Sequence, residues 1–135
     1  MTSIPDAFHD LFEKQTFAHV ATLTEETDPH VTPVWIDYDA DDERLLINTE
    51  RGRRKERNVR EDPSVGVSMI DPEDPYRRLS IIGEVEELAT EGARDHIDEL
   101  AQRYTGEDEY GAPIETERVV LRIRVDEIVD AQDSS

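Results

Sequence analysis

The sequence predicts a mainly β fold in which six strands form an antiparallel barrel and small helices cover its ends or one side. Six segments of the 135-residue chain have the alternating or continuous apolar pattern of strands. Most are joined by links of hairpin length, which favours antiparallel pairing over a doubly wound sheet with helical crossovers. The order of the strands cannot be derived from this pattern.

The N-terminal half is expected to contain two helices and three strands. Pro5 lies near the start of the first helix, which turns Phe8, Leu11 and Phe12 inward. The first two strands form a plausible hairpin around a turn at 25–29. In order, the expected elements are a helix over 5–14, strands over 17–24, 30–38 and 44–49, and a basic helix that begins near Arg53 and ends near Asp62 and Pro63.

The C-terminal half is expected to contain three more strands and one amphipathic helix. Gly83 marks a bulge or a close backbone approach in the fifth strand. The helix carries an apolar stripe of Ala93, Ile97, Leu100, Ala101 and Tyr104. The expected elements are strands over 65–70 and 79–88, a helix over 91–104, a strand over 117–125 and a frayed tail over 130–135. Residues 1–135 thus form a single domain with its core over about 5–128.

Composition restricts the function classes. The chain has no cysteine, no signal-peptide pattern and no apolar run long enough to span a membrane, so we expect a cytoplasmic protein. It has 34 acidic residues, and lysine occurs only at positions 14 and 55. This balance is typical of proteins from salt-accumulating halophiles, although an ordinary acidic protein is the alternative. A net charge of −19 disfavours a nucleic-acid partner.

Positive charge is concentrated in residues 51–60. This window holds six of the 15 basic residues and one acidic residue, a net charge of +5, so the remaining 125 residues carry −24. Thr49 is a candidate cap for the basic helix, and Gly52 permits a tight turn before it. Cations in a first helical turn oppose the helix dipole unless an anion is bound there. The window therefore indicates a phosphate-binding site, with a solvated basic helix as the alternative.

Several catalytic signatures are absent from the sequence. It contains no glycine-rich nucleotide motif, and its four histidines, His9, His19, His30 and His96, do not have metal-ligand spacing. Its serines have no paired base, and no catalytic residue or metal ligand is assigned.

Five short segments follow one another in a distinctive order and spacing: residues 30–35 (HVTPVW), 46–49 (LINT), 52–59 (GRRKERNV), 62–65 (DPSV) and 77–85 (RRLSIIGEV). Together they resemble the pyridoxamine 5′-phosphate oxidase-like family of FMN-binding split β-barrels. The similarity covers roughly residues 5–128 and is greatest to a short subgroup of probable F420-dependent enzymes. The chain lacks a recognisable C-terminal segment for a substrate phosphate, which argues against pyridoxal phosphate synthesis.

The resemblance implies where a cofactor would lie. It assigns the phosphate of FMN or F420 to Arg54 and Lys55, and the ring to the strand that carries Thr32, Pro33, Val34 and Trp35. Asn48 and Thr49 match cofactor-contacting positions at a strand end, although capping of the basic helix is the alternative. Trp35 could equally belong to the core. The two further assigned residues are Asn58, more readily a residue that locks the helix in place, and Arg78, which the family often uses from the other subunit.

The resemblance also implies a homodimer with cofactor at the interface and hydride transfer to a small-molecule substrate. Apolar residues on both faces of 119–125 agree with burial against a partner as well as the core. The alternatives are a non-catalytic carrier of FMN or F420 and a haem-handling protein. For haem, His19 or His30 would be the axial ligand.

Overall fold

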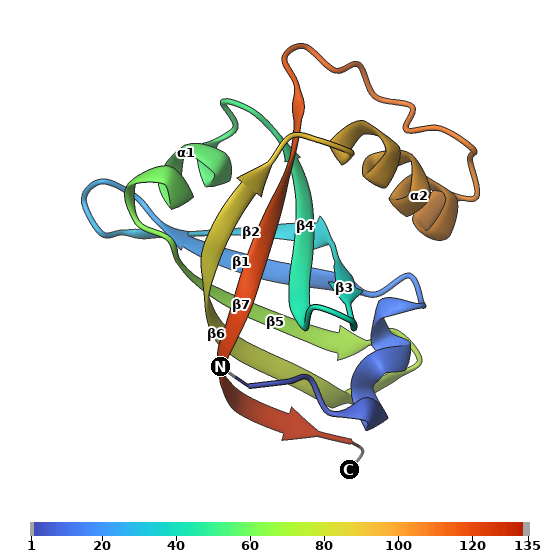
Figure 1. Ribbon diagram of the computed structural model, residues 1–135. Helices are drawn as coiled ribbons and strands as arrows, with labels where there is room; N and C mark the ends of the chain where they lie inside the picture. The colour runs from blue at the N-terminus through green and yellow to red at the C-terminus, as the bar shows by residue number, and fades with distance from the viewer. Residues whose placement is uncertain (1, 134–135) are drawn as a thin grey trace.

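The computed structural model describes residues 2–133 and confirms a mainly β fold (Figure 1). One antiparallel sheet of seven strands carries a short 3-10 helix and two α-helices. In chain order the elements are η1 (Asp6–Phe12), β1 (Phe17–Leu23), β2 (Pro29–Trp35), β3 (Asp37–Asp39), β4 (Arg44–Glu50), α1 (Arg54–Glu61), β5 (Ser64–Asp71), β6 (Asp74–Ala89), α2 (Ala93–Thr105) and β7 (Arg118–Gln132).

The sheet curls because two strands that are consecutive in the chain lie at its opposite edges. The strand order is β2-β1-β5-β6-β7-β4-β3, and only Ile36 separates β2 from β3. The two edges must therefore approach each other, as in a barrel split along one side. The strand expected over residues 30–38 is in fact two strands, which explains why the sheet has seven strands rather than six. Figure 1 shows the resulting half-barrel, with β4, β6 and β7 crossing in front of β1, β2 and β5.

Tyr104 on α2 holds the chain in place at Ile36, between β2 and β3. Its buried hydroxyl accepts a hydrogen bond from the backbone N–H of Ile36 at 3.2 Å and donates to the carbonyl of Thr16. Burial is the main cause that raises the pKa of this hydroxyl, which therefore stays protonated and able to donate. Helix α2 is thus attached to the point where the chain passes from one edge of the sheet to the other.

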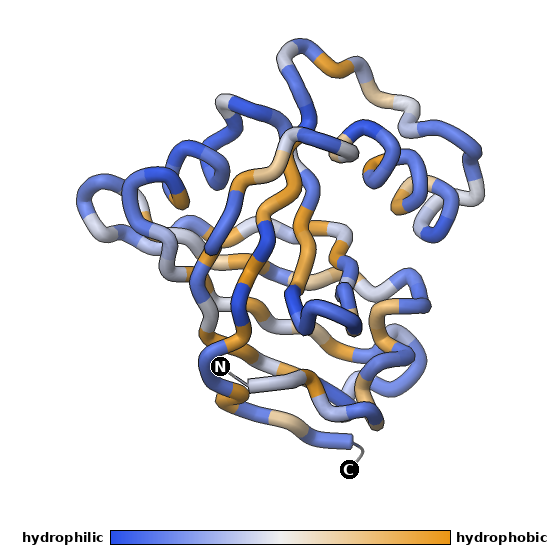
Figure 2. The backbone as a smooth tube through the Cα atoms, in the orientation of Figure 1, coloured by the Kyte–Doolittle hydropathy of each residue, from blue (hydrophilic) through white to orange (hydrophobic). Residues whose placement is uncertain are grey.

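The core lies inside the curled sheet. Alternate residues of β7 (Val119, Leu121, Ile123 and Val125) point into it and are fully buried. Figure 2 shows this alternation along the strands, whereas α1 is hydrophilic over most of its length. The inward trio of η1 and the apolar stripe of α2 are buried as expected. Strand β7 continues to Gln132, so residues 130–132 belong to the sheet rather than to the expected tail; 134–135 lie outside the described residues.

Gly83 combines both features expected of it. The pairing of β6 with β7 shifts register between Ile82 and Gly83, and a Cβ atom on Gly83 would lie 2.3 Å from the carbonyl oxygen of Arg124. Because that contact is with backbone, no side-chain rotation relieves it. We expect Gly83→Ala to lower the free energy of unfolding by about 1–3 kcal/mol in urea denaturation. Gly111→Ala is the matched control, because nothing lies within 4 Å of its added methyl group; equal stability of the two variants would contradict the prediction.

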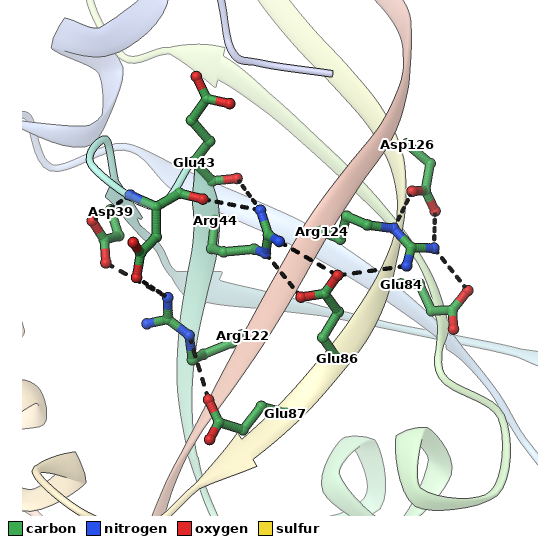
Figure 3. A network of polar contacts seen from close by, with 10 residues as sticks. Asp39, Glu43, Arg44, Glu84, Glu86, Glu87, Arg122, Arg124 and Asp126 are labelled. Atoms are coloured by element: carbon green, nitrogen blue, oxygen red, sulfur yellow. Dashed lines mark hydrogen bonds and ion pairs between the residues drawn. The ribbon is translucent and has the colours of Figure 1, made fainter. Parts of the chain in front are cut away.

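Charged side chains cover the outward faces of β4, β6 and β7 as an alternating network (Figure 3). Arg124 Nε lies 2.6 Å from Asp126 Oδ1, and its Nη2 lies 3.2 Å from Glu84. Arg44 Nε donates to Glu86 at 3.0 Å, and Arg122 pairs with Asp39 at the end of β3 and Asp42 on the turn that follows. The arginines of this face are therefore neutralised within the chain.

Asp71 forms the most buried ion-pair cluster. Its carboxylate accepts two hydrogen bonds from Lys14 Nζ at 3.0 Å, one from Arg77 at 2.9 Å and one from the backbone N–H of Glu73. Burial alone would raise the pKa of Asp71, but these donors outweigh it and lower the pKa to about 2. Ionised Asp71 therefore stabilises the fold above the carboxyl's ordinary pKa, and this stabilisation is lost as pH falls through about 2.

We expect Asp71→Asn to cost about 1–3 kcal/mol at neutral pH, because the amide leaves two cations without their shared carboxylate. The difference from wild type should shrink as pH falls from about 4 to about 2. Urea unfolding across this range measures both effects. Asp133→Asn is the control, because its exposed carboxylate pairs with the same Arg77; an equal cost for the two variants, or a cost that does not vary with pH, would refute the account.

Candidate functional site

Two hollows flank helix α1, and they differ in chemistry. The first, of about 260 Å³, lies between α1 and the turn joining β1 to β2. Of the described residues 2–133, no apolar side chain lines it, and four carboxylates face its two arginines. Its lining residues are Thr24, Glu25, Glu26, Asp28, Arg54, Arg57, Asn58 and Glu61. Such a surface offers no platform for a flat aromatic ring.

The second hollow combines apolar, aromatic and cationic side chains. It has a volume of about 220 Å³ and lies where the ends of β2, β4 and β7 meet the start of α1 and the side of α2. Arg53, Lys55 and Arg118 supply positive charge, and within the described part of the chain Glu50 is the single acidic residue that lines it. The other lining residues are Phe17, Pro33, Val34, Trp35, Asn48, Thr49, Ile97 and Tyr110. We name this hollow the α1–α2 pocket.

Ion pairing distinguishes the cations of the hollows from the other cations of the chain. Within residues 2–133, every Lys and Arg forms an ion pair with a carboxylate except Arg53, Arg54, Lys55, Arg57 and Arg118. All five line one of the two hollows. In a chain with 34 acidic residues, such unpaired cations are unexpected unless an outside anion binds them.

The start of α1 differs from the expected capping. Thr49 lies inside β4, and the N-cap position is Arg53, without a side-chain cap. The fully buried carboxylate of Glu56 instead accepts a hydrogen bond from the N–H of Gly52 at 2.8 Å and pairs with Arg60. Glu56 thus supplies one negative charge at this helix terminus. Arg53 and Lys55 leave the helix on the side of the α1–α2 pocket, whereas Arg54 and Arg57 leave it on the other side.

The pocket's cations are held close together in partly dehydrated surroundings. Burial, followed by the charges of Arg53 and Arg118, lowers the pKa of Lys55. Burial also lowers the pKa of Arg118, whose guanidinium lies 4.9 Å from the centre of the Tyr110 ring. Each cation raises the free energy needed to keep its neighbours charged. A bound anion would offset both the burial and the mutual repulsion, so the pocket is suited to a phosphate or carboxylate.

Aromatic rings form one wall of the pocket. Trp35 stacks on Tyr104, with ring centroids 5.1 Å apart and planes 10° apart, and meets Tyr110 edge-on. Phe17 contacts Tyr104 and is 54% exposed. Trp35, Tyr104 and Tyr110 belong to a small apolar cluster with Ile97 and Leu100 of α2. Their preorganised faces can accept a planar heterocycle.

The structure brings together six of the ten residues that the sequence assigned to a cofactor. Pro33, Val34, Trp35, Asn48, Thr49 and Lys55 all line the α1–α2 pocket. Arg54 and Asn58 line the other hollow, where buried Asn58 donates to Thr22 on β1 at 2.9 Å. Thr32 lies on β2 but does not line the pocket. Arg78 lies on the outward side of β6, where it pairs with Asp130 of β7.

Other pocket residues had little or no signal in the sequence. Arg53 is part of the basic window, but nothing in the sequence places it nearer the pocket than Arg54. Arg118 precedes the apolar alternation of β7, and Tyr110 lies in a polar loop. Arg118 joins the pocket because β4 pairs with β7 from Glu50 opposite Arg118 onward, whereas Tyr110 is held there by contact with Trp35 and a hydrogen bond to Asp98. Contacts between elements this far apart in the chain cannot be predicted from local sequence patterns.

The pocket opens beside an uncharged sheet face. One cross-strand row consists of Val31, Ala21, Gly66 and Ile82, and the next of Pro33, His19, Ser68 and Ser80. Neither row contains Asp, Glu, Lys or Arg, although these make up 36% of the chain. Val31 is 57% exposed and Ile82 48% exposed. We name these eight residues the β1–β5 face; its member Pro33 also lines the pocket.

The outward side of β7 does not form such a face. Val120, whose apolar character suggested a partner, is buried within the chain, on a strand that α2 packs against. The neighbouring outward positions are Arg122 and Arg124 of the charged network. Residues 119–125 therefore give no separate support for a dimer, which stays a prediction.

Proteins of known structure share the fold of this chain. An F420 reductase of known structure is 29% identical, with a TM-score of 0.79 over 93% of this chain and 98% of that protein. Two further structures share the fold. HupZ from Group A Streptococcus is 17% identical, with a TM-score of 0.65 over 98% of both chains. General Stress Protein 26 from Bacillus anthracis is 15% identical, with a TM-score of 0.67 over 91% of this chain and 89% of that one.

No curated protein sequence matches significantly. Within residues 2–133, no helix has the length and apolar character needed to cross a membrane. A family model described as pyridoxamine 5′-phosphate oxidase matches residues 4–131, nearly the whole chain. This protein therefore belongs to the pyridoxamine 5′-phosphate oxidase family.

Proposed function

We propose that this protein is an oxidoreductase that holds F420 or FMN in the α1–α2 pocket and catalyses hydride transfer to a small-molecule substrate. The observation that carries the proposal is the meeting of three cations without carboxylate partners and an aromatic wall in one pocket. Family membership and the similarity to an F420 reductase support the same class of chemistry. The cofactor would supply the hydride chemistry, and the protein would supply position and charge.

The residues of the pocket fit such a cofactor. Arg53, Lys55 and Arg118 would hold its phosphate or another anionic group through charge-assisted hydrogen bonds. Phe17, Pro33 and Trp35 would pack against the ring. We assign Arg53 and Arg118 to the anion alongside Lys55, because Arg54 faces the other hollow of the same chain.

The size of the pocket supports a site that two chains share. Its volume of about 220 Å³ falls below the roughly 300–1,000 Å³ of typical cofactor pockets. The β1–β5 face borders it through Pro33 and lacks the charges that would oppose contact between two copies of a −19 chain. We propose that this face pairs with the same face of a second copy, which would complete the pocket.

The dimer is tested by light scattering after size-exclusion chromatography in molar KCl, where we expect about twice the 15.5 kDa chain mass. Gly66→Arg places a charge at the centre of the β1–β5 face, and only the Ala21 side chain lies within 4 Å of its Cβ. The variant should be monomeric and bind cofactor weakly. Wild-type protein that is monomeric at micromolar concentration and still binds cofactor would contradict the shared site.

The function is tested by titrating purified protein with FMN and with F420 at high salt. A bound chromophore absorbs at about 450 nm for FMN, about 420 nm for F420 and about 400 nm for haem. Turnover with a hydride donor then separates an enzyme from a carrier. Binding of neither cofactor by folded protein would refute the proposal, and binding without turnover of any acceptor would favour a carrier.

A further inference from the structure

A chain of hydrogen bonds runs beneath α2 to the α1–α2 pocket and is not explained by cofactor contact. It contains Asp37 of β3, His96 of α2, Asn48 of β4 and Arg118 of β7. His96 Nε2 lies 3.1 Å from Asp37 Oδ2, and His96 Nδ1 lies 3.0 Å from Asn48 Nδ2. Arg118 Nε donates to Asn48 Oδ1 at 2.9 Å. The adjacent strands β3 and β4 thus meet two elements that lie far along the chain, α2 and β7, in one polar chain.

The partners of Asn48 determine where the proton of His96 lies. An arginine only donates, so the Asn48 atom that meets Arg118 must be its carbonyl oxygen. Asn48 Nδ2 also donates to the carbonyl of Ala93 at 2.9 Å, an acceptor only, which independently requires the same amide orientation. His96 Nδ1 must then accept, and the ring proton lies on Nε2, facing Asp37. The observed arrangement therefore requires a neutral imidazole.

Asp37, at the end of the hydrogen-bond series farthest from the pocket, is held in its ionised form. Burial opposes ionisation of Asp37, but the hydrogen bond from His96 and the charge of Arg103 outweigh it and lower the pKa of Asp37. Arg103 also pairs with Asp37 at 3.2 Å. Asp37 on β3 contacts His96, and Arg103 on the same helix as His96 contacts Asp37. On the strands that α2 packs against, Arg118 meets Asn48, the pocket is also lined by Glu50, and Arg122 pairs with Asp42.

We propose that His96 is a positioning residue for the α1–α2 pocket. In its neutral form it orients Asn48 so that the Arg118 guanidinium stays at the pocket wall, without a carboxylate partner. A second proton, on Nδ1, would set an N–H donor against the Asn48 amide nitrogen. Rotating that amide would relieve the conflict but would take the acceptor away from Arg118 and the donor away from Ala93. Protonation of His96 therefore loosens Arg118 and weakens binding of an anionic ligand.

The direction of the pH effect separates positioning from simple attraction. An imidazolium adds positive charge near the pocket, so a purely electrostatic role for His96 would strengthen anion binding on acidification. Loss of the Arg118 contact predicts the opposite. Histidine side chains in general change charge between about pH 5 and pH 8, so a comparison of binding at these two pH values tests the direction.

The first experiment needs no ligand. Nitrogen-15 NMR of the unliganded protein at about pH 8 should show His96 with its proton on Nε2. The Arg118 Nε–H resonance should shift with the same midpoint as the His96 ring, and it should not do so in His96→Gln. Arg122, which pairs with Asp42 and Glu87, is the internal control. A proton on Nδ1, or an Arg118 resonance independent of the His96 titration, would overturn the proposal, and wild type alone decides this if the variant unfolds.

The second experiment rests on the proposed function. The dissociation constant of FMN or F420 should rise roughly tenfold more in wild type than in His96→Gln between about pH 8 and pH 5, the scale of one lost charge-assisted contact. The comparison cancels titration of the ligand's own phosphate. A wild-type affinity that improves relative to the variant on acidification would refute positioning. If neither cofactor binds, the proposed function fails, and the NMR result still decides the role of His96.

Discussion

Replacing Arg53 and Lys55 together with alanine should weaken FMN or F420 binding by roughly 2–4 kcal/mol, or about 30- to 1,000-fold. Both side chains line the α1–α2 pocket, and neither forms an ion pair within the described residues 2–133. Their removal therefore deprives the ligand of two charge-assisted contacts without leaving a buried carboxylate unpaired. Arg53 is exposed and Lys55 only partly buried, so the fold should survive the change.

The matched control is the Arg54→Ala, Arg57→Ala double variant. It removes the same charge from the same helix, but its side chains are exposed and line the other hollow. A binding site that depends on direct contact should lose far less affinity in this control than in the pocket variant. Equal losses would mean that the helix attracts the ligand only through its total charge. Titrations monitored by cofactor fluorescence, with folding checked by circular dichroism, distinguish these results.

Much of the fold could be predicted because it depends on local patterns. Residue spacing and residue type predict the alternation along β7, the apolar stripe of α2 and the bulge at Gly83. The division between β2 and β3 is not. Residues 30–38 read as one strand, and the break at Ile36 arises because the curled sheet requires the chain to change edges there. Closure of a barrel is a property of the whole sheet.

The site was predictable to the extent that charge is local. The basic window marked α1, and the strand ends at Trp35 and Asn48 lie beside it as the resemblance implied. A helix presents its residues on different sides, however, so the window alone could not divide Lys55 from Arg54. The roles of Arg118 and His96 were beyond reach, because both depend on contacts between elements more than 40 residues apart.

Salt should stabilise the fold over a wide range. The residues outside the basic window carry −24, and at about 0.01 M salt the Debye length of roughly 30 Å leaves that repulsion nearly unscreened. At about 1 M it falls to roughly 3 Å. Screening also weakens the exposed ion pairs of the charged network, but such pairs contribute only about 0–1 kcal/mol each. We therefore expect the urea midpoint to rise with KCl; a midpoint that falls would show that the ion pairs outweigh the repulsion.

Cofactor binding should persist, or even strengthen, over the same range of salt. The acidic surface repels an anionic ligand from a distance, and salt screens that long-range term most. Contacts with Lys55 and Arg118 occur where burial lowers the pKa of both cations, so water and ions screen them least. Paired titrations at low and molar KCl, with folding checked by circular dichroism at each, measure the balance. Affinity that collapses at molar KCl while the fold persists would mean that the pocket attracts its anion only at long range, and the close contacts proposed for Arg53, Lys55 and Arg118 would be wrong.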